Sequence, residues 1–122
     1  MANLSTRPAP PPSPPAAALA ALADPTRRAI YESLGGAPRP VGAIAQGFSV
    51  SRPAVSQHLK ALRVAGLAVE TRTGTRHLYA VNPATALALR NYFQAMWECA
   101  MRAYVGHVAA EEQRHGRLPR RP

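Results

Sequence analysis

Basic, amide and hydroxyl side chains gather on one face of the segment from Ser51 to Leu67, which has the pattern of a single helix. On a helical wheel of about 3.6 residues per turn, Val55, Leu59 and Leu62 form an apolar stripe. The other side of the helix carries Arg52, Ser56, Gln57, Lys60 and Arg63. A helix of this kind can be anchored by its apolar stripe while its polar face lies in the major groove of DNA.

A solvated surface helix is the alternative interpretation of this segment. Such helices commonly mix both charge signs, whereas the chain has no acid between Glu32 and Glu70. The whole chain of 122 residues has 15 Lys and Arg against 6 Asp and Glu, a net charge of +9, and therefore attracts polyanions. No apolar run approaches the roughly 18–20 residues that span a bilayer, so we expect no membrane association.

The remaining composition favours a cytoplasmic protein, associated with the nucleoid when bound to DNA. The N-terminus lacks the apolar core of a signal peptide. The single cysteine, Cys99, fits a reducing compartment, and we expect it to be a small buried residue at the helix that forms the dimer. We expect no enzyme, because the sequence has no nucleophile–base constellation, no phosphate-cradling glycine loop and only 6 carboxylates.

Several short segments are expected to position the polar helix. Residues 16–23 favour a helix, and Asp24-Pro25 is a start signal for a second helix that runs to Leu34. A third, short helix over residues 41–46 is followed by a turn, and Ser51 caps the polar helix. A short helix, a tight turn and a capped second helix are the helix-turn-helix arrangement.

A hairpin follows the polar helix. Residues 67–72 and 75–81 are β-prone and are joined by a short turn through Thr73-Gly74. Arg72, Arg76 and His77 make its tip basic and polar. A basic hairpin after a recognition helix is a wing. The predicted fold is therefore mainly α with a small β-hairpin, a winged helix-turn-helix of order α-α-α-α-β-β-α.

The last helix is predicted to begin at Asn82-Pro83 and to continue to about Gln113. Apolar residues recur along it at spacings of three and four: Leu89, Phe93, Met96, Trp97, Ala100 and Tyr104. This face is broader than a small core needs, so we expect it to be a dimer interface. The predicted organisation is a disordered proline-rich arm over 1–15, a DNA-binding and dimerisation domain over 16–113, and a basic flexible tail over 114–122.

The chain resembles the ArsR/SmtB family of bacterial winged-helix transcription regulators. The resemblance rests on Ala21-Leu22-Ala23-Asp24-Pro25-Thr26-Arg27-Arg28, on Ser51 to Lys60, and on Ala65-Gly66-Leu67, in this order and spacing. It covers about residues 16–108. It implies a homodimer built on the first and last helices that binds a palindromic operator in double-stranded DNA. By the family pattern, the residues that face the groove are Ser51, Arg52, Ser56, Gln57 and Lys60.

Within that pattern, side-chain chemistry separates the expected roles. Gln57 is the best candidate for reading adenine and Arg52 for guanine, while Lys60 and Arg63 would hold phosphates. A plain structural role is an equal alternative for Arg63. We expect Arg72, Arg76 and His77 at the minor groove or the backbone beside it.

For Arg27 and Arg28, contact with the DNA backbone and ordinary surface charge are equal alternatives. His58 lies at the edge of the apolar stripe, where a packed, hydrogen-bonded histidine is expected. Repression is the family default, because a bound dimer occludes polymerase, but an activator would have the same residues.

The sequence departs from the family's metal sensors. Residues 40–46, where the family carries a thiolate site, have no Cys, His, Asp or Glu. We therefore expect no cofactor. The alternative is a nickel- or zinc-responsive switch that uses His107, Glu111 and His115, which share one face of the last helix. A further alternative is an accessory protein partner that binds the long apolar helix.

Overall fold

The computed structural model describes residues 15–115. These residues belong to two compact units, whose described parts are residues 15–90 and 91–115. The arm predicted over 1–15 and the tail predicted over 114–122 lie outside the described residues, except for Pro15, Arg114 and His115. The boundaries of the domain predicted over 16–113 stay a prediction.

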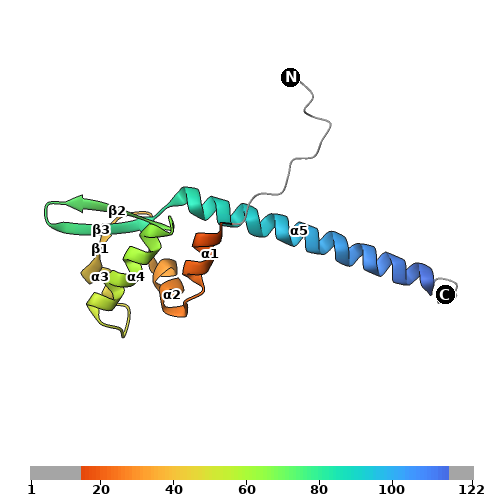
Figure 1. Cartoon of the computed structure of the whole chain (residues 1–122), viewed down its shortest axis with the longest axis horizontal. Helices are drawn as coiled ribbons and strands as arrows, with labels where there is room; N and C mark the ends of the chain where they lie inside the picture. The colour runs from red at the N-terminus through yellow and green to blue at the C-terminus, as the bar shows by residue number, and fades with distance from the viewer. Residues whose placement is uncertain (1–14, 116–122) are drawn as a thin grey trace, which may run out of the picture. The chain divides into compact units, whose positions relative to one another are not determined.

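The described residues form helices and strands in nearly the predicted order (Figure 1). The elements are α1 (Ala16–Leu22), α2 (Pro25–Ser33), β1 (Arg39–Pro40), α3 (Val41–Ala45), α4 (Arg52–Val64), β2 (Ala68–Thr73), β3 (Arg76–Val81) and α5 (Pro83–Arg114). The first unit holds α5 as far as Arg90 and the second unit holds the rest of it. The predicted winged helix-turn-helix order is thus confirmed, with one addition, β1.

Strand β1 was not predicted from the sequence. It pairs antiparallel with β3, with Arg39 opposite Tyr79 and Pro40 opposite Leu78, and completes a sheet of order β1-β3-β2. Two residues are too few to show a strand periodicity, and proline ordinarily marks a break. Pro40 is tolerated because β1 lies at the edge of the sheet, where a missing N–H is harmless.

The predicted caps fix the starts of α2 and α4. The Asp24 carboxylate accepts a hydrogen bond from the Thr26 N–H at 3.0 Å. The Ser51 hydroxyl oxygen accepts one from the Ala54 N–H at 3.2 Å. Each cap satisfies a donor that has no partner within its own helix. Helix α4 therefore begins where the sequence predicts the polar helix to begin.

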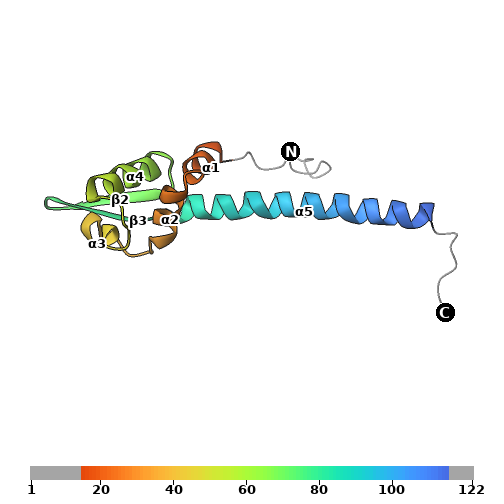
Figure 2. The same ribbon diagram turned by 90° about the horizontal axis from the view of Figure 1, so that it is seen from below.

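The turn of the hairpin is shifted by one residue from its predicted position. Thr73 pairs with Arg76, so the two turn residues are Gly74 and Thr75 rather than Thr73 and Gly74. Gly74 has a φ of +64°, in the left-handed region that favours glycine. The hairpin projects from the rest of the first unit (Figure 2).

Helices α3 and α4 pack against the sheet, and the apolar stripe of α4 lies at the centre of the core. Val55, Leu59 and Leu62 are fully buried, as predicted. They pack with buried residues that come from the other helices, from the β2–β3 hairpin and from the chain beside them: Ala18, Ala21, Ile30, Leu34, Ile44, Leu67, Ala68, Tyr79 and Leu89. Among residues 15–115, no helix is long and apolar enough to cross a bilayer.

Candidate nucleic-acid interface

The side of α4 opposite the core is polar and exposed, as predicted. Arg52, Gln57, Lys60 and Arg63 are exposed, and Ser56 is half-buried. Burial of Val55, Leu59 and Leu62 fixes the rotation of α4, because these three side chains can enter the core in only one orientation. The polar face of the helix is therefore presented to solvent by packing on its opposite side.

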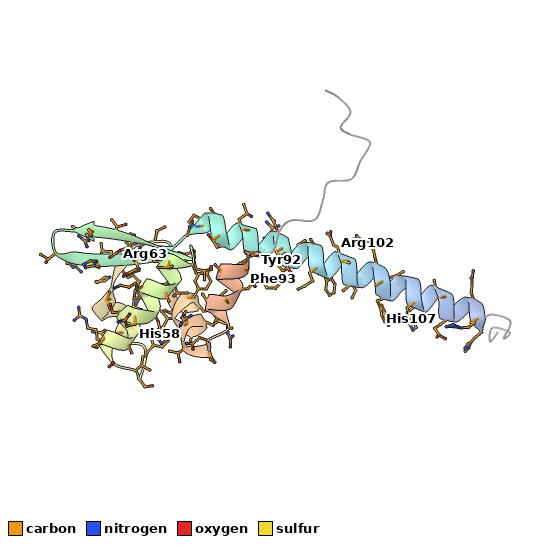
Figure 3. The ribbon with its side chains drawn as sticks, viewed as in Figure 1. His58, Arg63, Tyr92, Phe93, Arg102 and His107 are labelled. Carbon is orange, nitrogen blue, oxygen red and sulfur yellow. The ribbon has the colours of Figure 1, made fainter. Side chains whose placement is uncertain are left out.

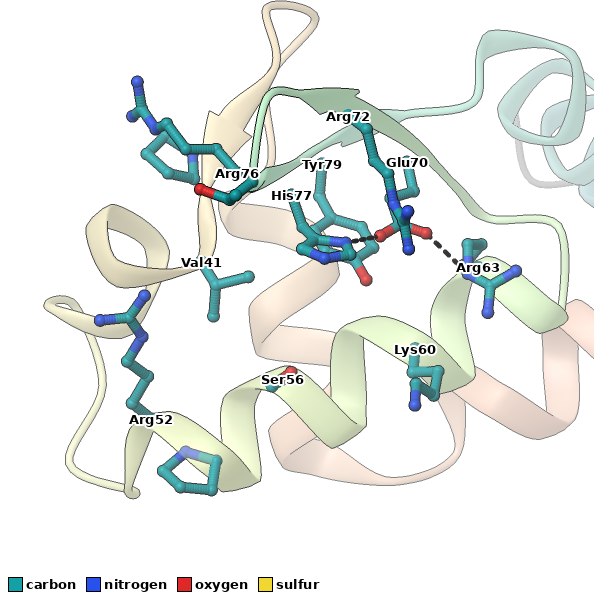
Figure 4. A pocket seen from close by; sticks show the side chains of 13 residues that line it. Val41, Arg52, Ser56, Lys60, Arg63, Glu70, Arg72, Arg76, His77 and Tyr79 are labelled. Atoms are coloured by element: carbon teal, nitrogen blue, oxygen red, sulfur yellow. Dashed lines mark hydrogen bonds and ion pairs between the residues drawn. The ribbon is translucent and has the colours of Figure 1, made fainter.

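A groove of about 840 Å³ lies between α4 and the β2–β3 hairpin, and we call it the wing groove (Figure 4). It brings together most of the predicted DNA-binding residues: Arg52, Ser56, Lys60, Arg63, Arg72, Arg76 and His77. Helix α4 and the wing thus line one predominantly basic groove. Ser51 and Gln57 do not line it.

Gln57 lies on the other side of α4. With Lys60 and Arg27, it lines a second groove, of about 570 Å³, between α1 and α4. Lys60 borders both grooves and therefore lies on the crest of the helix between them. The structure thus separates the two residues predicted to read bases, since Arg52 lies on the wing side and Gln57 on the α1 side.

The guanidinium of Arg52 lies against the first turn of α3. A methyl group at Gly42 would be 3.5 Å from Arg52 Cζ, an ordinary van der Waals distance. Figure 4 shows Arg52 at the end of the wing groove nearest α3. An alanine at position 42 would therefore touch Arg52 without displacing it.

Glu70 is the functional candidate that the sequence did not reveal. Its carboxylate is hydrogen-bonded to His77 Nδ1, and its other oxygen lies 3.5 Å from Arg63 Nε. Helix α4 itself has no acid, as the sequence shows, but the fold places an acid from β2 beside it. The position of Glu70 and Arg72 two residues apart on one strand is the available signal, because such residues share a face of the sheet.

The surroundings of Glu70 shift two pKa values in opposite directions. The hydrogen bond with His77 is the main cause that lowers the pKa of Glu70, and the charges of His77, Arg63 and Arg72 add to it. Burial raises the pKa of the neighbouring Tyr79 hydroxyl, and the negative charge of Glu70 raises it further. Glu70 is thus a carboxylate at neutral pH.

The lowered pKa of Glu70 makes one contribution to stability depend on pH. Its folded pKa lies below the ordinary value of 4.5, so this contribution is complete above that value and is lost as pH falls through the folded pKa. We expect the difference in melting temperature between wild type and Glu70→Gln to shrink as pH falls below 4.5, because Glu70 then takes up a proton. Circular-dichroism melts across this pH range measure the difference in melting temperature. A difference that does not change with pH would contradict this prediction.

Arg27 and Arg28 have structural contacts. Arg28 donates a hydrogen bond to the Leu22 carbonyl at 2.9 Å, and Arg27 lies 3.7 Å from the Asp24 carboxylate. Both therefore secure the junction between α1 and α2, which favours the structural alternative for them. His58 is half-buried, with its Nδ1 at 3.9 Å from Asp24, an ion-pair distance rather than the expected hydrogen bond.

Arg63 also has a structural partner, since its Nε atom faces Glu70. Its expected role as a phosphate contact is therefore shared with a role inside the protein. The same holds for His77, whose hydrogen bond joins it to Glu70. The contacts of these two residues with DNA stay predictions.

The predicted dimer residues are of two kinds. Leu89 is 8% exposed and lies in the core of residues 15–90, so its side chain is already used within the chain. Beyond it, α5 carries a run of exposed apolar and aromatic side chains (Figure 3). They include the predicted Phe93, Met96, Trp97, Ala100 and Tyr104.

Cys99 is exposed in the single chain, so its predicted burial at the dimer helix would require a second copy and stays a prediction. Phe93 packs edge-on against Tyr92, with ring centroids 5.7 Å apart. This contact lies within α5 and leaves Phe93 exposed. The apolar face of α5 is therefore available for a partner.

The predicted metal ligands do not form a site within the described chain. Between residues 15 and 115, no three His, Cys, Asp or Glu side chains gather as a metal would require. Glu111 pairs with Arg114, and His115 Nε2 lies 3.5 Å from Glu111. His107 is not among their partners. The nickel or zinc switch therefore stays a prediction that needs ligands from two subunits.

A helix-turn-helix with a capped, exposed polar helix and a basic hairpin beside it defines a winged helix-turn-helix DNA-binding protein. Comparisons with known proteins agree. A family described as "Helix-turn-helix domain" matches residues 22–72. Over 91 residues the chain is 45% identical to the HTH-type transcriptional regulator Rv2034 of Mycobacterium tuberculosis, covering 75% of this chain and 85% of that protein.

Solved structures support the same assignment. An ArsR-like transcriptional regulator from Rhodococcus sp. RHA1 is 30% identical with a TM-score of 0.59, covering 81% of this chain and 90% of its own. The homodimeric winged helix-turn-helix DNA-binding domain of a Mycobacterium bovis protein is 28% identical with a TM-score of 0.54. This match covers 80% of this chain and 78% of the Mycobacterium bovis chain. The chain belongs to the ArsR/SmtB family of winged helix-turn-helix transcriptional regulators.

Proposed function

We propose that two copies of this chain bind a palindromic operator and regulate transcription from it in the cytoplasm. The observation that carries the proposal is the exposed polar face of α4, flanked by the basic wing along the wing groove. Pairing of two copies is supported by the exposed apolar face of α5 and by the homodimeric domain from Mycobacterium bovis. Two recognition helices would then enter major grooves about 34 Å apart.

The positions of the side chains support distinct roles along α4. Gln57 has an amide that can bond adenine in a bidentate manner, and Arg52 a guanidinium that can do so with guanine. Ser51 and Ser56 supply hydroxyls for phosphates or bases, although Ser51 also caps the helix. Lys60, on the crest of α4, is placed to hold a phosphate.

The wing supplies a second set of contacts. Arg72 and Arg76 lie on its two strands, and both line the wing groove. They are therefore placed for the backbone or the minor groove next to the major groove that α4 would enter. Their guanidinium groups would add to the affinity for any sequence.

Gln57→Ala and Lys60→Ala should change DNA binding in different ways. The test first selects tight-binding duplexes from a random library with the wild-type protein, and then titrates a selected and a scrambled duplex by fluorescence anisotropy. Gln57→Ala should weaken only the selected duplex, by about 1–3 kcal/mol for each base pair it reads. Lys60→Ala should weaken binding to both duplexes alike. It should also reduce the slope of the logarithm of affinity against the logarithm of salt concentration by about 1 per copy.

Arg90→Ala is the matched control for Lys60, because Arg90 is exposed and lines neither groove. It removes the same charge and should leave both titrations near wild type. Unchanged discrimination in Gln57→Ala would contradict its assignment as a base-reading residue. Equal effects of Lys60→Ala and Arg90→Ala would show that Lys60 makes no particular phosphate contact.

Repression is the expected direction of regulation, because a dimer on an operator can block polymerase, whereas an activator would have the same residues. Reporter transcription with and without the protein separates a repressor from an activator. An accessory protein that binds the apolar helix stays a prediction. A second copy of the chain accounts for the exposed face of α5 without one.

A further inference from the structure

Glu70 is the one acid among the residues that line the wing groove within the described chain. All other charged groups of the lining are basic or imidazole side chains: Arg52, Lys60, Arg63, Arg72, Arg76 and His77. An acid on a surface that binds polyanions lowers its affinity for every phosphate. Glu70 therefore opposes the binding of phosphates at this groove.

The carboxylate of Glu70 joins two elements that should each meet DNA. One oxygen is bonded to His77 on β3, and the other faces Arg63 on α4. Figure 4 shows the carboxylate between these two side chains, with Arg72 beside it. The two oxygens thus occupy a cation and an imidazole that would otherwise be available to a DNA phosphate.

Exposure distinguishes the acid from its partners. The side chain of Glu70 is 20% exposed, whereas those of Arg63 and His77 are 42% and 43% exposed. The acid therefore lies behind the two groups that face solvent. DNA that approaches the wing groove would meet Arg63 and His77 first, and Glu70 already contacts both of these side chains.

We infer that Glu70 determines specificity by suppressing binding to DNA of arbitrary sequence. This inference rests on the proposed function. Binding to arbitrary sequence depends on how many phosphates a protein neutralises. Glu70 reduces that number, because it cancels one positive charge and restrains two side chains that would otherwise follow the backbone in any register.

The bound operator should depend less on this restraint. Contacts of Arg52 and Gln57 with bases would fix the register, so only phosphates at set positions can be reached. Once freed from Glu70, the Arg63 and His77 side chains would therefore make more new phosphate contacts on a random duplex than on an operator. Removal of the Glu70 charge should lower the ratio of the two affinities.

Glu70→Gln tests the inference by anisotropy titrations of a random-sequence duplex and a selected duplex over a range of salt concentrations. We expect roughly three- to tenfold tighter binding of the random duplex near 0.1 M salt and a salt slope steeper by about 1 per copy. The selected duplex should tighten less. Glu70→Asp, which keeps the charge, should restore most of the wild-type discrimination.

Glu32→Gln is the matched control, since Glu32 is exposed on α2 and lines neither groove. It makes the same change in net charge and should leave the ratio of affinities unchanged. Circular-dichroism melts check that each variant folds. If Glu70→Gln does not melt cooperatively, Glu70→Thr carries the same test with a residue that favours a strand.

Equal tightening on both duplexes would reveal a general charge effect and overturn the inference. Weaker or unchanged binding of the random duplex would assign Glu70 a structural role alone and would also overturn it. Both outcomes leave the proposed function intact. That function fails separately if the wild-type protein selects no sequence from the random library.

Discussion

Trp97→Glu should separate the two copies of the chain and lower operator affinity at least about a hundredfold. Trp97 is 59% exposed and lies on α5 at helical spacing from Phe93 and Tyr104, which are exposed as well. A carboxylate placed in the centre of an apolar interface would be desolvated without a partner, at a cost of several kcal/mol. Each separated copy would then hold a single half-site and lose the gain from simultaneous binding of two.

Light scattering measures the separation as a fall from twice 13.0 kDa to the 13.0 kDa of one chain. Arg102→Gln is the control, because it lowers the net charge by the same amount on the side of α5 away from Trp97. It should leave both the mass and the affinity unchanged. A Trp97→Glu protein that stays dimeric would show that the copies pair through another surface.

Leu59→Ala should lower the free energy of unfolding by about 2–5 kcal/mol, the range found for such truncations in packed cores. Leu59 is fully buried on the apolar stripe of α4 and packs with residues of the other helices and the sheet. Its removal leaves a cavity directly behind the polar face of the recognition helix. DNA binding should fall with stability, because the loosened helix no longer presents Lys60 and Gln57 in a fixed orientation.

Denaturant unfolding followed by circular dichroism measures this loss. Val64→Ala on the same helix is the control, because Val64 is 76% exposed and should cost well under 1 kcal/mol. The two variants remove aliphatic groups from one helix at opposite depths. Similar losses in both would contradict the assigned rotation of α4.

The sequence determined the local features of this protein because they depend on neighbouring residues. Spacing of Val55, Leu59 and Leu62 specified the buried side of α4, and Ser51 specified its start. Asp24-Pro25 did the same for α2. The basic hairpin and the long last helix were predicted for the same reason, because turn signals and helical periodicity depend on residues that are close together in the sequence.

Tertiary structure decided which distant residues meet. It paired β1 with β3 across about forty residues of sequence, a contact that no local periodicity encodes. It also placed Leu89 in the core rather than at an interface, because the start of α5 belongs to the first unit. These outcomes depend on how elements pack, which residue spacing alone does not specify.

The same distinction applies to the candidate site. The sequence identified α4 and the wing as the binding elements and predicted a surface without acids on α4. Only the packing of β2 against α4 brought Glu70 to Arg63, and only the rotation of α4 placed Gln57 and Arg52 on opposite sides of Lys60. Periodicity along one helix determines which residues are exposed, whereas the neighbours of that helix determine which charges those residues meet.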